Sequence, residues 1–210
     1  ILDSSITNDI DKDSQIETNA LMVENKTGKI IALAGGKNYE KSQYNRTIYS
    51  KRQVGSTMKP FLYYAALENG FTASSTFLSE PTTFSLGNNQ TYTPNNFGNI
   101  YPSYPIPLTL ALAYSDNIYA VKTHLFLGED AIVNVANKAG IKTKLNKNVS
   151  LPLGTTELNM IEFTNAYSTI ANEGIYNKLY LIRKVENENG STIYKHKDNS
   201  NKVLNKNYTY

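Results

Sequence analysis

A serine, a lysine and a proline lie close together in the stretch Gly55-Ser56-Thr57-Met58-Lys59-Pro60, and residues 61–66 that follow are all apolar or aromatic. Proline costs about 3 kcal/mol inside a helix but very little in the first turn, where N–H groups have no partner within the helix. Pro60 therefore predicts a helix that starts near Ser56 and continues to Glu68. The apolar run predicts that this helix is buried, so the rest of the chain must pack around it.

Ser56 and Lys59 lie three residues apart, which places them on one face of such a helix. Serine is a weak nucleophile unless a nearby base removes its proton, and lysine becomes a base when burial lowers its pKa. Serine and lysine are also common residues whose spacing can be a coincidence of a solvated surface. The apolar continuation favours a buried lysine, so we expect Ser56 to be a nucleophile and Lys59 its base.

Ser115-Asp116-Asn117 precedes a second helical pattern. All three residue types are good helix N-caps, so the tripeptide predicts a helix start. The Ser115 hydroxyl could also relay a proton to a leaving amine, and the Asn117 amide could both orient Lys59 and donate to a substrate carbonyl. The two interpretations are compatible.

Lys26-Thr27-Gly28 is the third short peptide of interest, because Lys-Thr-Gly accompanies Ser-X-X-Lys and Ser-Asp-Asn in enzymes that penicillin acylates. Here it lies between two apolar runs, 20–23 and 29–34, with Gly28 suited to a positive φ. This pattern predicts a hairpin turn rather than a catalytic strand. No later Lys-Thr-Gly follows in the chain.

Apolar spacing and glycine stops predict the remaining elements. We expect helices at 108–113, from Ile118 to Gly128, around 132–139 and from Met160 towards Gly174, and a hairpin of 180–185 with 192–194. Residues 71–107 show no sustained period. Their aromatic side chains favour an ordered loop that covers a binding site over a floppy insertion.

Composition excludes several function classes. A net charge of +3 without a basic cluster argues against nucleic-acid binding. The chain has no cysteine and only two histidines, which leaves no disulfide and few ligands for zinc, and we expect neither a metal nor a cofactor. Its longest apolar runs are far shorter than a membrane span.

Taken together, these motifs resemble the transpeptidase domain of a class A penicillin-binding protein of the low-GC Gram-positive type. The resemblance runs from Leu2 to about Tyr194 through the following stretches: TNALMVENKTGKIIALAGG, NRTIYSKRQVGSTMKPFLYYAALENG, SDNIYAVKTHLFLG, SLPLGTTELNMIEFTNAYSTIANEG and VENENGSTIY.

The resemblance implies a serine acyltransferase that acts on the D-Ala-D-Ala end of peptidoglycan stem peptides and is inhibited by β-lactams. Ser56 would be the nucleophile, Lys59 the base, Ser115 the proton shuttle and Asn117 the group that holds Lys59 and the substrate. The backbone N–H of Ser56 would form half of the oxyanion hole.

Two departures from the family pattern matter. The family's catalytic Lys-Thr-Gly follows the other two motifs, so we expect the strand that completes the site to lie outside this chain. Class A β-lactamases also carry Glu-X-X-Leu-Asn, but here Thr155 stands in the place of the glutamate that activates the deacylating water. With threonine in that place, fast hydrolysis of β-lactams would lose its base. A β-lactamase, or a non-catalytic β-lactam sensor of the same fold, is the alternative function.

We expect a mixed α/β fold of the serine β-lactamase and transpeptidase type, with an antiparallel sheet, helices on both faces and the C-terminal strands missing. Residues 1–19 are expected to be a lead-in segment, 20–194 a partial transpeptidase domain and 195–210 a linker. The expected partners are stem peptides, β-lactams, the absent C-terminal part and an N-terminal glycosyltransferase domain. The resemblance places the protein at the extracytoplasmic face of the bacterial membrane, anchored by a segment outside this chain.

Overall fold

The computed structural model describes residues 15–209, so most of the expected lead-in segment (1–19) lies outside the described residues. The chain divides into two compact units. Unit 1 comprises residues 1–52, 138–142 and 158–210, and unit 2 comprises residues 53–137 and 143–157. All four predicted site residues belong to unit 2.

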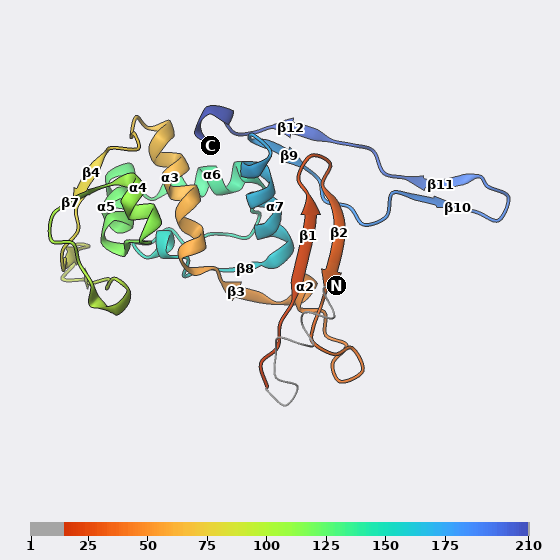
Figure 1. Cartoon of the computed structure of the whole chain (residues 1–210), viewed down its shortest axis with the longest axis horizontal. Coiled ribbons are helices and arrows are strands. Elements are labelled where there is room, and N and C mark those ends of the chain that lie inside the picture. The colour runs from red at the N-terminus through yellow and green to blue at the C-terminus, as the bar shows by residue number, and fades with distance from the viewer. Residues whose placement is uncertain (1–14, 210) are drawn as a thin grey trace. The chain divides into compact units, whose positions relative to one another are not determined.

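Unit 2 is built around the predicted buried helix (Figure 1). A short 3-10 turn, η1 (Gly55–Met58), runs directly into α3 (Lys59–Glu68), and Pro60 lies in the first turn of α3 as the sequence predicts. The side chains from Met58 to Ala66 are buried except for Pro60, so this helix is core on nearly all sides.

Three further helices accompany α3 in unit 2: α4 (Leu108–Ala113), α5 (Asn117–Leu127) and α6 (Asp130–Ala139), whose last two residues belong to unit 1. Helices α3, α4 and α5 pack against one another. Tyr63 of α3 and Tyr119 of α5 meet edge to face with ring centroids 6.0 Å apart. Aromatic pairs of this kind add to the free energy gained by burial.

The expected covering loop, residues 71–107, is ordered and contains short elements: β4 (Thr76–Leu78), β5 (Phe84–Ser85), β6 (Thr91–Tyr92), the 3-10 turn η2 (Phe97–Asn99) and β7 (Pro105–Pro107). Strand β4 pairs antiparallel with β7, and β5 pairs with β6. Both ends of the segment are thus fastened together beside α4. Another 3-10 turn of unit 2, η3 (Leu151–Leu153), ends at Gly154.

Unit 1 begins with the predicted hairpin of β1 (Ala20–Glu24) and β2 (Lys29–Ala34). Gly28 closes its turn with φ +77°, and a Cβ there would lie 2.8 Å from the Lys178 carbonyl oxygen, so only glycine fits. Helix α7 (Met160–Ala171) packs against β1. A one-turn helix that the sequence patterns did not predict, α2 (Arg46–Tyr49), follows the loop after β2 and is capped by Asn45.

The remaining strands of unit 1 form a second group: β9 (Ile175–Asn177), β10 (Lys184–Glu186), β11 (Thr192–Lys195) and β12 (Ser200–Lys202), followed by the 3-10 turn η4 (Lys206–Tyr208). Strand β10 pairs with β11 around the predicted Asn189-Gly190 turn. Strand β12 pairs with β9, so part of the segment expected to be a linker forms a strand.

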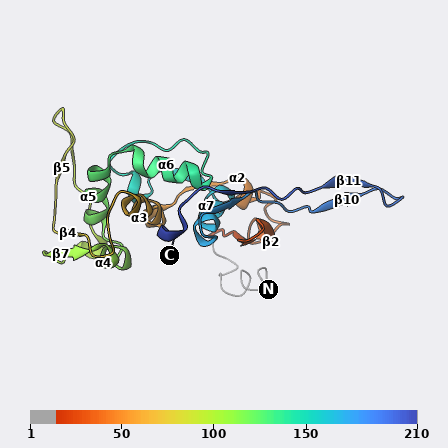
Figure 2. The ribbon, with the colours of Figure 1, turned by 90° about the horizontal axis from the view of Figure 1, so that it is seen from above.

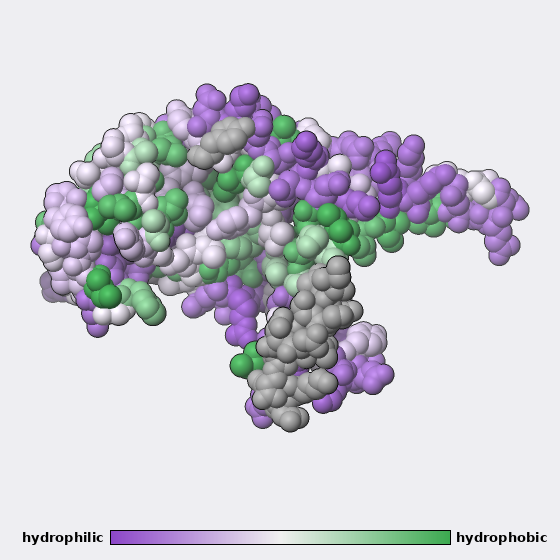
Figure 3. Space-filling model, viewed as in Figure 1, coloured by the Kyte–Doolittle hydropathy of each residue, from purple (hydrophilic) through white to green (hydrophobic). Residues whose placement is uncertain are grey.

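The β10–β11 hairpin projects as an arm from the other strands of unit 1 in two perpendicular views (Figures 1 and 2). Figure 3 shows the arm as mostly hydrophilic, with hydrophobic residues along its lower edge near the base. The exposed large apolar residues of 181–195 are Leu181, Ile182, Val185, Ile193 and Tyr194. Two of the four boundaries between the units fall within β3 (Lys51–Gln53) and β8 (Glu157–Asn159).

The predicted mixed α/β class is therefore confirmed, and each of the five ladders with a resolved register is antiparallel. Across residues 15–209 the strands pair two by two rather than in one wide sheet. Within that same range, no helix is long and apolar enough to cross a membrane.

Candidate functional site

Ser56 lies in η1, and Lys59, three residues later, is the first residue of α3. Ser56 is exposed, whereas the Lys59 side chain is buried, with 1% of the residue accessible. A buried ammonium group is costly unless it is fully hydrogen-bonded, so the surroundings of Lys59 decide what this site can do.

Three acceptors surround the Lys59 amine. Its Nζ donates to the Ser115 carbonyl oxygen at 2.6 Å and to Asn117 Oδ1 at 2.6 Å, and lies 2.9 Å from Ser115 Oγ. An ammonium group has three N–H donors, and this arrangement uses all of them. The structure thus brings together Lys59 and the two residues that the sequence analysis paired with it.

Ser56 is less tightly connected to this cluster. Among the hydrogen bonds of the described residues, none joins Ser56 Oγ to Lys59 Nζ. Ser56 is linked to Lys59 through the backbone, because the Lys59 N–H donates to the Ser56 carbonyl. Ser56 is exposed. Exposed side chains change rotamer within nanoseconds, so the Ser56 hydroxyl can change its direction quickly.

Burial changes the acid–base behaviour of the amine. It lowers the pKa of Lys59 from 10.5 to about 8, and the negative charge of Asp116 opposes this shift. About a tenth of the Lys59 side chains are therefore neutral at pH 7. In the neutral form two N–H groups can keep the carbonyl oxygens of Ser115 and Asn117 occupied, which leaves the lone pair to accept a hydroxyl proton.

Ser115 has an unusual backbone. Its φ is +55°, a left-handed conformation that costs a residue with a Cβ about 1–2 kcal/mol. This turn directs both the carbonyl oxygen and the hydroxyl of Ser115 towards Lys59. Strain of this kind gathers at functional sites, where the surroundings hold the residue in place.

Asp116 serves as the N-cap of α5, as one of the two interpretations of the tripeptide predicts. Its Oδ1 accepts a hydrogen bond from the Tyr119 N–H at 2.7 Å. The tripeptide therefore does both things at once: Asp116 caps α5, while its neighbours Ser115 and Asn117 accept hydrogen bonds from Lys59.

A loop distant in sequence supports the turn that carries Ser56. The Gly55 N–H donates to the Gly154 carbonyl at 3.1 Å. Gly154 has φ +69°, and a Cβ there would lie 2.1 Å from the Gly55 carbonyl oxygen and 2.4 Å from its nitrogen. The backbone before Ser56 can therefore lie against this loop only because residue 154 has no side chain.

Two other sequence features have local roles. In the Lys26-Thr27-Gly28 turn, the N–H groups of Thr27 and Gly28 both donate to the Glu24 carbonyl, which confirms the hairpin turn. The Thr155 hydroxyl lies 3.0 Å from Ser150 Oγ and donates to the Ser150 carbonyl at 3.3 Å. Thr155 has no carboxylate and is engaged with Ser150, so it offers no base for a deacylating water.

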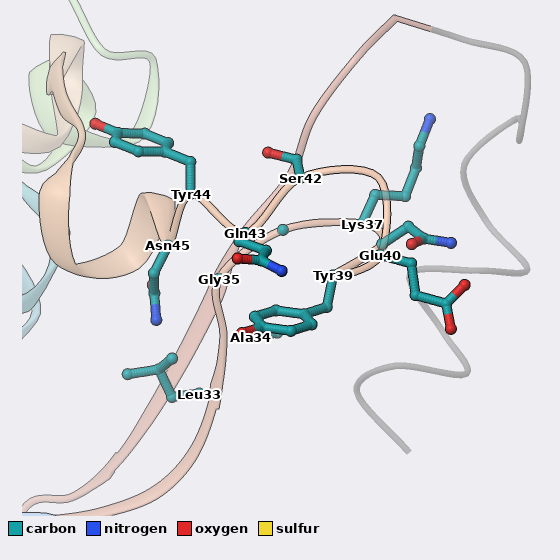
Figure 4. Close-up of a pocket in the computed structure, with 12 residues that line it drawn as sticks. Leu33, Ala34, Gly35, Lys37, Tyr39, Glu40, Ser42, Gln43, Tyr44 and Asn45 are labelled. Carbon is teal, nitrogen blue, oxygen red and sulfur yellow. The ribbon is translucent and has the colours of Figure 1, made fainter.

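A separate cavity of about 580 Å³ lies in unit 1 and is formed by the loop that follows β2, residues 33–45 (Figure 4). In Figure 4 the charged side chains of Lys37 and Glu40 lie on the opposite side of this loop from Leu33 and Asn45. The Tyr39 ring is 73% exposed. This cavity is lined by a loop with an exposed aromatic ring, whereas the Lys59 cluster holds a buried amine on three acceptors. We therefore take the Lys59 cluster as the candidate site. No group of three or more histidine or acidic side chains is placed to hold a metal ion anywhere in the described part of the chain.

The sequence analysis missed two residues: Asn96, which lies beside this cluster, and Gly154, which lies against Gly55. The Asn96 side chain is 8% exposed and accepts a hydrogen bond from the Asn117 N–H at 2.8 Å. The only signal for Asn96 was its place in the aperiodic covering segment. Gly154 ended the Leu-Pro-Leu-Gly stretch, but nothing local links it to Gly55.

Comparison with known proteins shows the family of the chain. Residues 18–210 match the family described as the penicillin binding protein transpeptidase domain. The chain is 40% identical over 205 residues to penicillin-binding protein 2D of Bacillus subtilis, covering 97% of this chain and 30% of that protein. It is 37% identical over 176 residues to penicillin-binding protein 1A of Pseudomonas aeruginosa, covering 83% and 21%. The chain thus spans less than a third of the length of these relatives.

Solved structures lead to the same fold. Penicillin-binding protein 1A from Haemophilus influenzae superimposes with a TM-score of 0.82 at 28% identity, covering 90% of this chain and 28% of that one. PonA1 from Mycobacterium tuberculosis in complex with penicillin V has a TM-score of 0.82 at 20% identity, covering 98% and 57%. The second similarity concerns the fold alone.

Proposed function

Because this chain belongs to the family of penicillin-binding protein transpeptidase domains, we propose that it carries the acylation site of a serine D,D-transpeptidase that cross-links peptidoglycan. The observation that carries this proposal is the buried Lys59 amine, which Ser115 and Asn117 hold one helical turn from the exposed Ser56. The substrates are stem peptides that end in D-Ala-D-Ala.

The first half of the reaction forms an acyl-enzyme. Neutral Lys59 accepts the proton of the Ser56 hydroxyl, and Ser56 Oγ attacks the carbonyl carbon of the penultimate D-Ala. The backbone N–H of Ser56 donates to the oxyanion that develops. When the C–N bond breaks, the proton passes from Lys59 through Ser115 Oγ to the nitrogen of the leaving D-Ala, which restores the neutral amine.

The second half transfers the acyl group. An amine of a neighbouring strand attacks the ester carbonyl and loses one proton to Lys59, and Ser56 Oγ leaves and regains that proton. The Asn117 side chain keeps Lys59 in place in both halves, while its amide group is the donor proposed for the substrate carbonyl. A β-lactam acylates Ser56 by the same first half, and its ring-opened product remains attached.

The whole protein is proposed to act at the extracytoplasmic face of the bacterial membrane, together with a glycosyltransferase domain and the part of the transpeptidase domain that bears the third signature. Support comes from the class A penicillin-binding proteins among its relatives, of which this chain covers only a part.

The test is to incubate the full-length protein and its Ser56→Ala variant with a fluorescent penicillin and, separately, with a D-Ala-D-Ala stem peptide. We expect stable labelling and D-Ala release from the wild type and neither from the variant. Labelling without D-Ala release would instead identify a sensor, and rapid turnover of the penicillin would identify a β-lactamase.

A further inference from the structure

The covering segment, residues 71–107, reaches the Lys59 cluster through a buried carboxylate. Asp116 is 3% exposed, and its Oδ2 accepts hydrogen bonds from Ser79 Oγ at 2.5 Å and from Asn96 Nδ2 at 2.7 Å. Both donors belong to this segment. A buried carboxylate needs such donors, so Asp116 and the covering segment hold each other in place.

The orientation of the Asn96 amide follows from its neighbours. Its Nδ2 faces the carboxylate of Asp116, and its Oδ1 accepts from the Asn117 N–H at 2.8 Å. Rotating the amide by half a turn would place oxygen against carboxylate and NH₂ against N–H. Nδ2 also donates to the Ile100 carbonyl at 3.2 Å. Only an uncharged amide can serve all of these groups at once.

Asn117 is consequently fixed at three points. Asn96 holds its backbone N–H, and the Asn95 carbonyl accepts from its Nδ2 at 2.7 Å. The remaining polar atom of its side chain, Oδ1, accepts from Lys59. The covering segment therefore determines where Oδ1 lies and, through it, where the Lys59 amine lies.

From these contacts we propose that Asn96 is a positioning residue for the acylation of Ser56, acting through Asn117 and Asp116 on Lys59. The proposal rests on the proposed transpeptidase function. Asn96 hydrogen-bonds to Asp116 and Asn117 and not to Ser56 or Lys59, so its expected effect is on the rate of acylation rather than on which bonds form.

Replacing Asn96 by aspartate keeps the size of the side chain but removes the NH₂ group. Two carboxylates would then face each other at a distance suited to a hydrogen bond, and one of them must take up a proton with a raised pKa. At acidic pH this shared proton restores the contact with Asp116, and at higher pH the two charges repel each other.

The other titratable groups around Asp116 are Lys59 and Tyr63 of α3 and Tyr119 of α5. Burial raises the pKa of Tyr119 to about 12 and that of Tyr63 further, so both stay neutral in the assay range. The titration of Lys59 that both proteins share cancels in the ratio of the two rates, and the ratio keeps what the new carboxylate adds, including any shift that its charge causes in the pKa of Lys59.

The experiment compares rate constants for fluorescent-penicillin labelling of the full-length wild type, Asn96→Asp and Asn96→Ala between about pH 5.5 and pH 8.5. Asn89→Asp is the matched control, because Asn89 is an exposed asparagine of the same covering segment. We expect Asn96→Ala to be at least about tenfold slower than the wild type at every pH, as the loss of a hydrogen bond that positions a catalytic group would cause. The ratio of Asn96→Asp to wild type should fall as the pH rises, while Asn89→Asp stays at a ratio near one.

The experiment compares rate constants of labelling instead of the final amount of labelled protein, so molecules that fail to fold do not affect the measured value. Asn96→Asp that labels like the wild type across the pH range would overturn the inference, and so would a loss of rate in Asn96→Asp that is the same at every pH. A wild type that does not label at Ser56 would instead refute the proposed function and would be recognised before any variant is compared.

Discussion

Lys59 Nζ donates a hydrogen bond to Asn117 Oδ1 at 2.6 Å, so a buried amine of α3 is held by the first residue of α5. The two helices pack against each other, and the Tyr63–Tyr119 ring contact lies one turn beyond Lys59 on α3. The aromatic contact of the core therefore fixes the separation of the two helices that carry the site. Acid–base chemistry and packing depend on the same pair of helices.

The rate of acylation should follow the neutral form of Lys59. Since burial lowers the pKa of Lys59 to about 8, we expect the labelling rate constant to rise about tenfold per pH unit below that value and to level off above it. Lys59→Met should lower the rate by about 10²–10⁴-fold at all pH values. Fluorescent-penicillin labelling over a pH series measures both, and a rate that is flat between pH 6 and pH 8 would contradict the role of Lys59 as the base.

Asp116 should tune this profile. Its charge raises the pKa of Lys59, against the larger effect of burial. Asp116→Asn removes the charge while asparagine remains a good N-cap, so the midpoint of the labelling profile should move below pH 8. Asp130→Asn serves as the control, because Asp130 pairs with Lys147 on the surface. If both variants share the wild-type midpoint, Asp116 does not act on Lys59 through its charge.

Much of the fold could be predicted from local patterns. Pro60 marks the start of α3, and glycines mark the ends of helices and the hairpin turns, because their effects depend on the backbone within a few residues. The pairing of Ser56, Lys59, Ser115 and Asn117 came from residue types and order, and the structure brings the last three together. Their catalytic roles remain predictions.

The support of the site could not be predicted in the same way. Two contacts join residues that are far apart in the sequence: Gly55 with Gly154, and Asn96 with Asp116. Neither the aperiodic covering segment nor a single glycine carries a periodic signal that identifies a partner. Such contacts depend on the tertiary arrangement, which overrides local preference.

The strained turn at Ser115 leads to a paired prediction. Ser115→Ala and Ser115→Gly both remove the proposed proton shuttle, so each should slow acylation by about 10²-fold or more. Only glycine relieves the positive φ of +55°, so the glycine variant should be more stable than the alanine variant by about 1 kcal/mol. Urea unfolding of the two variants gives the difference. Equal stability would indicate that the backbone at residue 115 stores no strain.

Gly154 should matter because of the space that its missing side chain leaves. In Gly154→Ala the new Cβ would fall within 2.1 Å of the Gly55 carbonyl oxygen, so the backbone that precedes Ser56 must move. Gly70→Ala is the matched control: Gly70 also has a positive φ, +88°, and follows α3, but a Cβ there meets nothing within 4 Å. Both variants carry the cost of a left-handed alanine, about 1–2 kcal/mol, and only the first displaces the nucleophile.

A displacement of about 1 Å at a reacting group costs about 10²-fold in rate, so Gly154→Ala should label with fluorescent penicillin about a hundred times more slowly than the wild type. Gly70→Ala should label at the wild-type rate, because α3 is left in place. The comparison uses the rate constant of the folded fraction, with thermal unfolding recorded for both variants. Equal labelling rates in the two variants would mean that the turn before Ser56 holds its position without the loop that ends at Gly154.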